Sequence, residues 1–123
     1  MQRQAADAYS RVGTATLPPR ELEASLLSRA AARLQAVKDE WDQRRSELDE
    51  ALTYNRKLWS VFASAATQPD GGLPREVRQN IANLSIFVFN HTLGIQAAPA
   101  PAKLAALINI NRTIAEGLRA PTR

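Results

Sequence analysis

The sequence contains no cysteine and only one histidine, and it has no long hydrophobic run. The missing cysteine excludes disulfide scaffolds, thiolate metal sites and thiol catalysis, and it suits a reducing compartment. A single histidine excludes the common metal sites built from several histidines. No stretch approaches the roughly 20 apolar residues of a membrane-spanning helix, and residues 1–8 lack the apolar segment of a secretory signal. We therefore expect a cytoplasmic protein with no metal, no cofactor and no contact with a membrane.

Length and composition favour one helical domain. The chain has 123 residues, 45% of them hydrophobic, and alanine and leucine supply much of the apolar set. A chain of this length typically folds as one domain, here residues 1–123, and alanine and leucine are strong helix formers. No segment alternates apolar and polar residues over enough length to predict a strand. The expected fold class is all-α, a small bundle or array of four main helices after a short N-terminal helix.

Prolines and polar residues indicate where the first helices begin and end. The short helix should cover residues 2–12. Pro18 and Pro19 should open the next helix, because proline is tolerated in the first helical turn. We expect that helix to end between Asp42 and Ser46, with Ser46 as the N-cap of the third helix. A single unbroken helix over residues 19–67 would be about 75 Å long, which exceeds a compact domain of this size.

The second half of the chain has clearer boundaries. Residues 68–72 combine proline, aspartate and two glycines, which predicts a tight turn after the third helix. Pro74 should open the fourth helix, and Gly94 is interpreted as its C-terminal cap. A proline-containing connector then leads to a last helix over about residues 102–118.

Apolar residues recur at steps of three or four within each block, which places them on one helix face. In the second helix this stripe is Leu22, Leu26, Ala30, Leu34, Val37 and Trp41. In the third helix it is Leu48, Leu52, Asn55, Trp59, Phe62 and Ala66, widened by Ala51, Leu58 and Val61. In the fourth helix it is Val77, Ile81, Leu84, Val88 and His91, widened by Ile86, Phe87 and Phe89. In the last helix it is Leu104, Leu107, Ile108, Ile114, Ala115 and Leu118.

The net charge of +4 is unevenly distributed. Residues 21–50 hold eight acidic and five basic side chains, whereas residues 51–123 hold eight basic and three acidic ones. The basic residues of the second region are spread over three expected helices. A nucleic-acid-binding protein normally gathers its basic residues on one face. RNA binding is therefore compatible with the charge but is not the favoured interpretation.

No residues form a recognisable catalytic pattern. The acidic residues between Asp39 and Glu50 alternate with lysine and arginine, which is typical of a solvated helix face. His91 has no recognisable nucleophile or orienting acid in the sequence. Phosphate-binding glycine loops, nucleophile elbows and zinc-binding histidine pairs are missing as well. We therefore expect the protein not to be an enzyme.

Six asparagines fall within the expected helices, where asparagine is a poor helix former. They are Asn55, Asn80, Asn83, Asn90, Asn109 and Asn111. A buried asparagine must find hydrogen-bond partners. These residues either tie helices together in the core or line a groove that binds another chain.

Three segments resemble the FlaF family of flagellar biosynthesis regulators from alphaproteobacteria. Residues 49–62 contain the pattern Tyr-Asn-x-x-Leu-Trp, and residues 73–88 contain Leu-Pro-x-x-x-Arg-x-Asn-Ile-x-Asn-Leu. Residues 108–119 and the N-terminal Ala8-Tyr9 fit as well. The resemblance extends over almost the whole chain, and it is specific because tryptophan and asparagine are uncommon inside helices.

The resemblance implies a small cytoplasmic factor required for flagellin synthesis and secretion, acting with the regulator FlbT. It also implies flagellin as the binding partner, with the protein as its secretion chaperone. The candidate contacts are Tyr54, Asn55, Trp59, Asn80, Asn83, Phe87 and His91. For Trp59 the alternative interpretation is a plain core residue, together with Phe62, Ile81 and Leu84.

Other functions remain compatible with the sequence. The main alternative is a post-transcriptional regulator that contacts flagellin mRNA, alone or with FlbT. A third option is a structural subunit of the export apparatus. An exposed apolar face could also be covered by a second copy of the chain, as a homo-oligomer.

Overall fold

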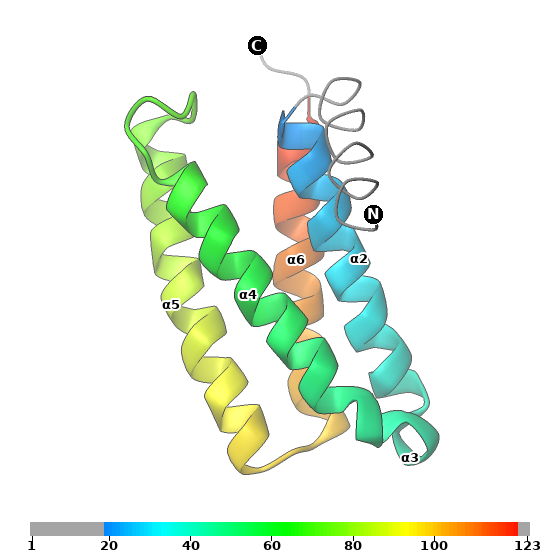
Figure 1. Ribbon diagram of the computed structural model, residues 1–123. Coiled ribbons are helices and arrows are strands. Elements are labelled where there is room, and N and C mark those ends of the chain that lie inside the picture. The colour runs from blue at the N-terminus through cyan, green and yellow to red at the C-terminus, as the bar shows by residue number, and fades with distance from the viewer. Residues whose placement is uncertain (1–18, 121–123) are drawn as a thin grey trace, which may run out of the picture.

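The structure, a computed structural model, describes residues 19–120, and this part of the chain is helical without any strand (Figure 1). The main helices are α2 (Pro19–Asp39), α4 (Leu48–Ala66), α5 (Arg75–Ala97) and α6 (Leu104–Arg119). The short helices α3 (Trp41–Arg44) and η1 (Arg45–Glu47) link α2 to α4, and η2 (Pro101–Lys103) precedes α6. The predicted all-α fold with four main helices is confirmed. The helix expected over residues 2–12 lies outside the described residues.

The four main helices form an up-and-down bundle in which consecutive helices run antiparallel (Figure 1). Around the bundle the order is α2, α4, α5 and α6. The helix α2 packs along α6 for most of its length, and α4 packs against both α2 and α5. By contrast, α5 and α6 contact each other least among the neighbouring pairs. One of the four edges of the bundle, between α5 and α6, is therefore more open than the others.

The break between α2 and α4 lies slightly earlier than the sequence predicts. Glu40 ends the first helical run with backbone angles of φ −119° and ψ 49°, and the chain then passes through α3 and η1. Ser46 lies inside η1 and is not an N-cap, because Glu47 precedes α4 and makes no side-chain capping bond. The two helices are thus separate, as expected, but the predicted cap is wrong.

The end of α5 also differs from the prediction. Gly94 is not a C-cap, because the helix continues three residues further to Ala97. Among the described residues the only glycine with a positive φ is Gly72, at 87° in the turn before α5. Ala98 leaves the helical conformation with φ −145° and ψ 81°. It precedes Pro99, and the residue before a proline is disfavoured in the helical region.

The core follows the predicted stripes closely in α4 and α6. All six residues of the α4 stripe are buried, and so are four of the six in α6. In α2 the buried set is shifted toward Ala24, Leu27 and Ala31, while Leu22 and Leu26 are only half-buried.

Three residues assigned to widened apolar faces are instead exposed. They are Val61, Ile86 and Phe87, with exposed fractions of 70%, 60% and 43%. The bundle has four helices, so each covers only part of its neighbours and the edges of a wide apolar face remain in solvent.

Candidate partner-binding groove

Two of the seven candidate contacts, Asn55 and Trp59, lie in the centre of the bundle. Trp59 Nε1 donates a hydrogen bond of 2.8 Å to Asn111 Oδ1 on α6. Asn111 Nδ2 in turn donates to Asn55 Oδ1 at 2.7 Å and to the carbonyl of Leu27 on α2 at 3.3 Å. Asn55, Trp59 and Asn111 have no exposed surface. In this fold neither candidate can touch a partner, and both fit the interpretation as a core network that ties helices together.

A third candidate, Tyr54, lies on a different side of the molecule from the rest. It is half-buried on the α4 surface facing α2, and the guanidinium of Arg33 stacks 4.9 Å from its ring centroid. Cation–π contacts of this kind are attractive and keep the ring covered. Tyr54 therefore stands apart from the other candidates.

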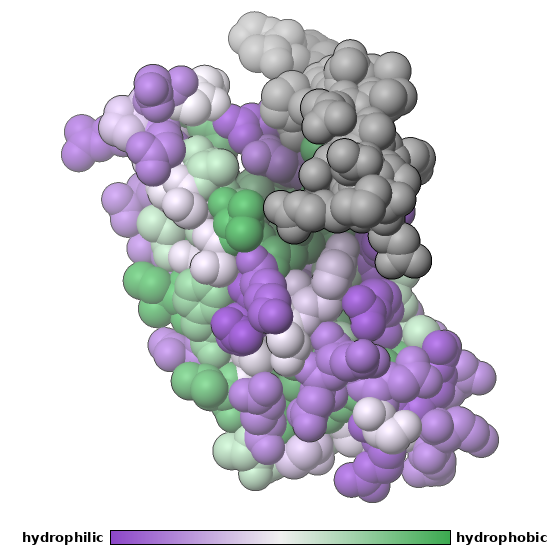
Figure 2. All heavy atoms as spheres, viewed as in Figure 1, coloured by the Kyte–Doolittle hydropathy of each residue, from purple (hydrophilic) through white to green (hydrophobic). Residues whose placement is uncertain are grey.

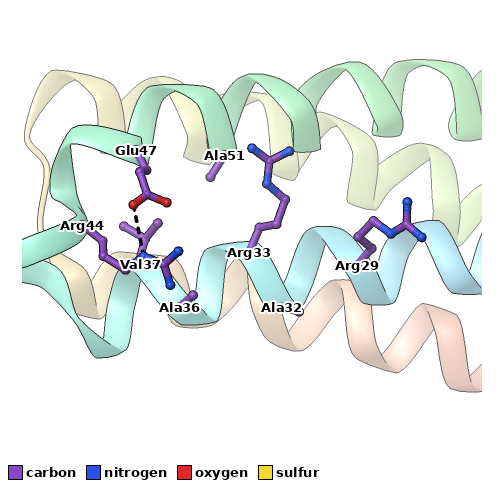
Figure 3. Close-up of a pocket in the computed structure, with 8 residues that line it drawn as sticks. All are labelled: Arg29, Ala32, Arg33, Ala36, Val37, Arg44, Glu47 and Ala51. Atoms are coloured by element: carbon purple, nitrogen blue, oxygen red, sulfur yellow. Dashed lines mark hydrogen bonds and ion pairs between the residues drawn. The ribbon is translucent and has the colours of Figure 1, made fainter.

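Next to Tyr54, a depression of about 260 Å³ lies between α2 and the start of α4 (Figure 3). Its floor is small and apolar, with Ala32, Ala36 and Ala51, and Arg29 and Arg33 border it. Arg44 donates a 3.1 Å hydrogen bond to Glu47 across one end, and this bond raises the pKa of the Arg44 guanidinium. The ion pair is exposed, so it contributes little to stability.

The remaining four candidates lie together on one face of α5. Asn80, Asn83, Phe87 and His91 follow one another at steps of three and four residues. The rings of Phe87 and His91 are stacked, with centroids 5.0 Å apart. His91 Nε2 lies 2.8 Å from the carbonyl oxygen of Lys103. Because a carbonyl oxygen only accepts hydrogen bonds, Nε2 carries the proton in this contact.

Next to this face of α5, Leu84 lines an open groove toward α6, and none of the four candidates itself lines that groove. The groove is a depression of about 200 Å³ whose lining is mostly apolar. Leu84 of α5 and the half-buried Ile110 and Ile114 of α6 form its floor, and Asn109 and Thr113 form the α6 rim. We call this site the α5–α6 groove. It lies on the edge of the bundle where the two helices contact each other least.

Charge is missing from the α5 side of this region, whereas α6 exposes Arg112 and Glu116 beside the groove. Residues 79–102 contain no aspartate, glutamate, lysine or arginine. The outer face of α5 also exposes Ile86 and Leu93, at 60% and 61%. Hydrophobic side chains reach the surface along α5 at the left of Figure 2, whereas the region around α3 is strongly hydrophilic. An uncharged surface with exposed large apolar side chains is typical of the centre of a protein interface.

Sequence reasoning missed the α6 side of this groove. The sequence places Ile114 on the apolar face of the last helix, and Asn109 is one of six asparagines in predicted helices. Helical periodicity identifies the apolar face of each helix but not which helix edges stay apart. The run of 24 residues without a charged side chain, 79–102, was a visible signal that points to α5.

Neither a metal-ligand cluster nor a membrane-spanning helix occurs in the part of the chain that the structure describes. Residues 19–120 contain no group of three or more histidine, aspartate or glutamate side chains placed to hold a metal ion. Within the same residues, no helix is both long and apolar enough to cross a membrane.

Comparison with known proteins gives a family. No curated protein and no solved structure matches the chain. The family described as flagellar protein FlaF matches residues 5–118, which include α2, α4, α5 and most of α6. Because the match covers nearly all of the sequence, the chain belongs to the FlaF family of flagellar proteins.

Proposed function

We propose that the protein is a non-enzymatic flagellin-binding chaperone and regulator, required in the cytoplasm for flagellin synthesis and secretion. The family places the protein in flagellar biology. The observation that carries the proposal is the open α5–α6 groove, whose floor of Leu84, Ile110 and Ile114 is apolar and whose α5 side lacks charge after Arg78. Covering such a surface with another apolar surface is favourable, because it removes apolar area from water.

Flagellin is the partner whose chemistry suits this surface. Its terminal segments are amphipathic helices that polymerise when they are free. A helical protein can cover such a segment by taking its apolar face into a groove between helices. Covering these segments keeps flagellin monomeric until it is exported. FlbT is a second proposed partner, acting with the protein in regulation.

The alternative, binding to flagellin mRNA, receives less support from the arrangement of the basic residues. Several arginines are engaged within the protein: Arg119 donates a 3.2 Å bond to Glu21, and Arg20 pairs with Glu23 at 2.6 Å. The exposed Arg75 and Arg112 are on different helices. RNA binding needs several basic side chains that contact phosphates together.

Titration of the purified protein with monomeric flagellin tests the proposal. We expect a complex at micromolar concentrations whose affinity changes little between low and high salt, because the lining of the α5–α6 groove has no charged side chain. A stoichiometric amount of the protein should also delay flagellin polymerisation. The absence of any complex would remove the proposal.

Titration of the same protein with flagellin mRNA tests the alternative function. Phosphate contacts make affinity fall steeply with salt, because bound counterions are released. If RNA bound tightly with a steep salt dependence, and Arg75→Glu with Arg112→Glu abolished that binding, the alternative would replace our proposal. We expect this double variant to bind flagellin as the unmodified protein does.

A further inference from the structure

We propose that the α5–α6 groove holds one amphipathic helix of the partner protein, with a single large apolar side chain as its anchor. This inference rests on the proposed function and names the place and the chemistry of binding. The partner helix would lie along the bundle edge and pack against both α5 and α6. Its positions beside the anchor would be polar but uncharged.

The first argument is that this edge of the bundle is the one left open. Packing closes the edges between α2 and α6, α2 and α4, and α4 and α5. Among the hydrogen bonds between described residues, the only one that joins α5 to another element by a side chain is that of His91 with Lys103. That bond lies at the end of the groove next to the 98–103 connector. An additional helix can therefore extend the bundle here without displacing an existing contact.

The second argument is the size of the depression. Its volume is about 200 Å³, and its floor consists of Leu84, Ile110 and Ile114. An apolar cavity of about 150 Å³ is large enough to bind a benzene molecule. The depression thus has room for one leucine, isoleucine, methionine or phenylalanine side chain. The stacked rings of Phe87 and His91 lie about one and two helical turns beyond Leu84 along α5, toward the connector.

The third argument concerns the length of the bound segment. The α5 face that borders the groove extends from about Asn80 to His91. At about 1.5 Å per residue these residues span roughly 17 Å. The groove therefore contacts about three turns of a partner helix, which suits one anchor with apolar neighbours one turn before and after it.

The fourth argument selects the chemistry of the partner. The polar side chains at the rim are Asn109 and Thr113 of α6, with Asn80 and Asn83 nearby on α5, and none of these four is charged. The exposed Arg112 and Glu116 of α6 do not line the depression. Burying a charged group without an opposite charge is unfavourable, whereas amides and hydroxyls hydrogen-bond other uncharged polar groups. The groove therefore favours an amphipathic helix flanked by asparagine, glutamine, serine or threonine. It disfavours a nucleic acid or a strongly charged helix.

Site-specific photo-crosslinking in the full-length protein tests this placement. A photoreactive amino acid is placed at Thr113 in the groove, at Leu93 on the outer face of α5, or at Ser64 on α4, all exposed positions. Each variant is mixed with monomeric flagellin and irradiated, and the products are analysed by mass spectrometry. We expect flagellin to be captured from position 113, through one segment of a terminal helix, and not from positions 64 or 93.

Paired substitutions give a second readout. Thr113→Arg places a charge at the groove rim, where partner binding would desolvate it, so we expect flagellin affinity to fall by about tenfold or more. Ser64→Arg adds the same charge to an exposed position of α4 and should leave affinity unchanged. Circular dichroism should show equal melting temperatures for both variants, because both sites are exposed.

The outcomes separate this inference from the proposed function. Flagellin binding with crosslinks only from position 93 or 64, and unchanged affinity of Thr113→Arg, would overturn the groove but leave the function standing. Crosslinks between two copies of the chain at position 113 would mean that a second copy occupies the groove, which also overturns the inference. If the unmodified protein forms no complex with flagellin, both proposals fail.

Discussion

The indole Nε1 of Trp59 donates a 2.8 Å hydrogen bond to Oδ1 of Asn111, which joins α4 to α6 at the centre of the bundle. These two helices are diagonal neighbours, so the bond crosses the core and does not follow one of its edges. Asn111 extends the connection to α2 through the carbonyl of Leu27. The tryptophan and asparagines of the family pattern thus hold three helices in register.

Asn111→Ala should lower the free energy of unfolding by about 2 to 4 kcal/mol, because it leaves two buried polar side-chain groups without partners. Those groups are Trp59 Nε1 and Asn55 Oδ1. Urea denaturation measures the change. Asn109→Ala on the same helix is the control, because Asn109 is exposed and its loss should change stability by less than about 0.5 kcal/mol. Equal effects of the two substitutions would contradict the buried network.

Trp59→Ala should destabilise the protein by about 3 to 5 kcal/mol, since it removes a large side chain from a closed core. Trp59→Phe keeps most of the apolar contacts, including those with Phe62, whose ring meets the indole edge-on at a centroid distance of 5.3 Å. It should cost about 1 to 3 kcal/mol through the lost hydrogen bond. Thermal unfolding of the two variants and the unmodified protein measures these differences in stability. If Trp59→Ala abolished flagellin binding without lowering the melting temperature, Trp59 would be a contact residue after all.

Gly94→Ala should raise the free energy of unfolding by about 0.5 to 1 kcal/mol, because alanine is the better residue inside a helix. A Cβ atom at this position meets nothing within 4 Å. Gly72→Ala should have the opposite sign and cost about 1 to 2 kcal/mol, since Gly72 has a φ of 87°. Together the two substitutions test whether α5 continues past Gly94, as in the structure, or ends there with Gly94 as its C-cap, as the sequence predicts. Destabilisation by Gly94→Ala would show that the helix ends at Gly94.

Ile81→Ala and Ile86→Ala form a matched pair on α5 that tests how this helix is rotated in the bundle. Ile81 is buried, so its truncation should cost about 2 to 5 kcal/mol. Ile86 is largely exposed, and its truncation should change stability by less than about 0.5 kcal/mol. Chemical denaturation of both variants measures the difference. A large loss for Ile86→Ala would mean that a second element covers this face in solution.

Much of the fold could be predicted because helix signals are local. The steps of three and four residues from Leu48 to Ala66 identify the buried face of α4 correctly, residue by residue. The turn at residues 68–72 follows from its proline, aspartate and glycines, which match the turn geometry. The predicted helix ends were wrong where two local signals favour different end positions. At Gly94 the glycine suggests a cap, yet Pro99 and its preceding residue end the helix.

The candidate site was less predictable, because it depends on how helices meet. The sequence alone does not distinguish Asn111, which is buried among three helices, from Asn109, which is exposed two residues earlier. Both are asparagines in the same predicted helix. Likewise, Val61 and Ala51 both widen the predicted face of α4, but only Ala51 meets a neighbouring helix. Only the packing of the bundle assigns these residues to the core or to the surface.

The open edge of the bundle also has a consequence for motion. The helices α2, α4 and α6 share the buried network around Asn111, whereas α5 has no part in it. Glycines lie in the connector before α5, and prolines lie in the connector after it. Segments with fewer contacts open at lower free energy than the rest of a protein. We expect backbone amides of α5 to exchange with deuterium before those of the other three helices. A partner bound across α5 and α6 should slow that exchange.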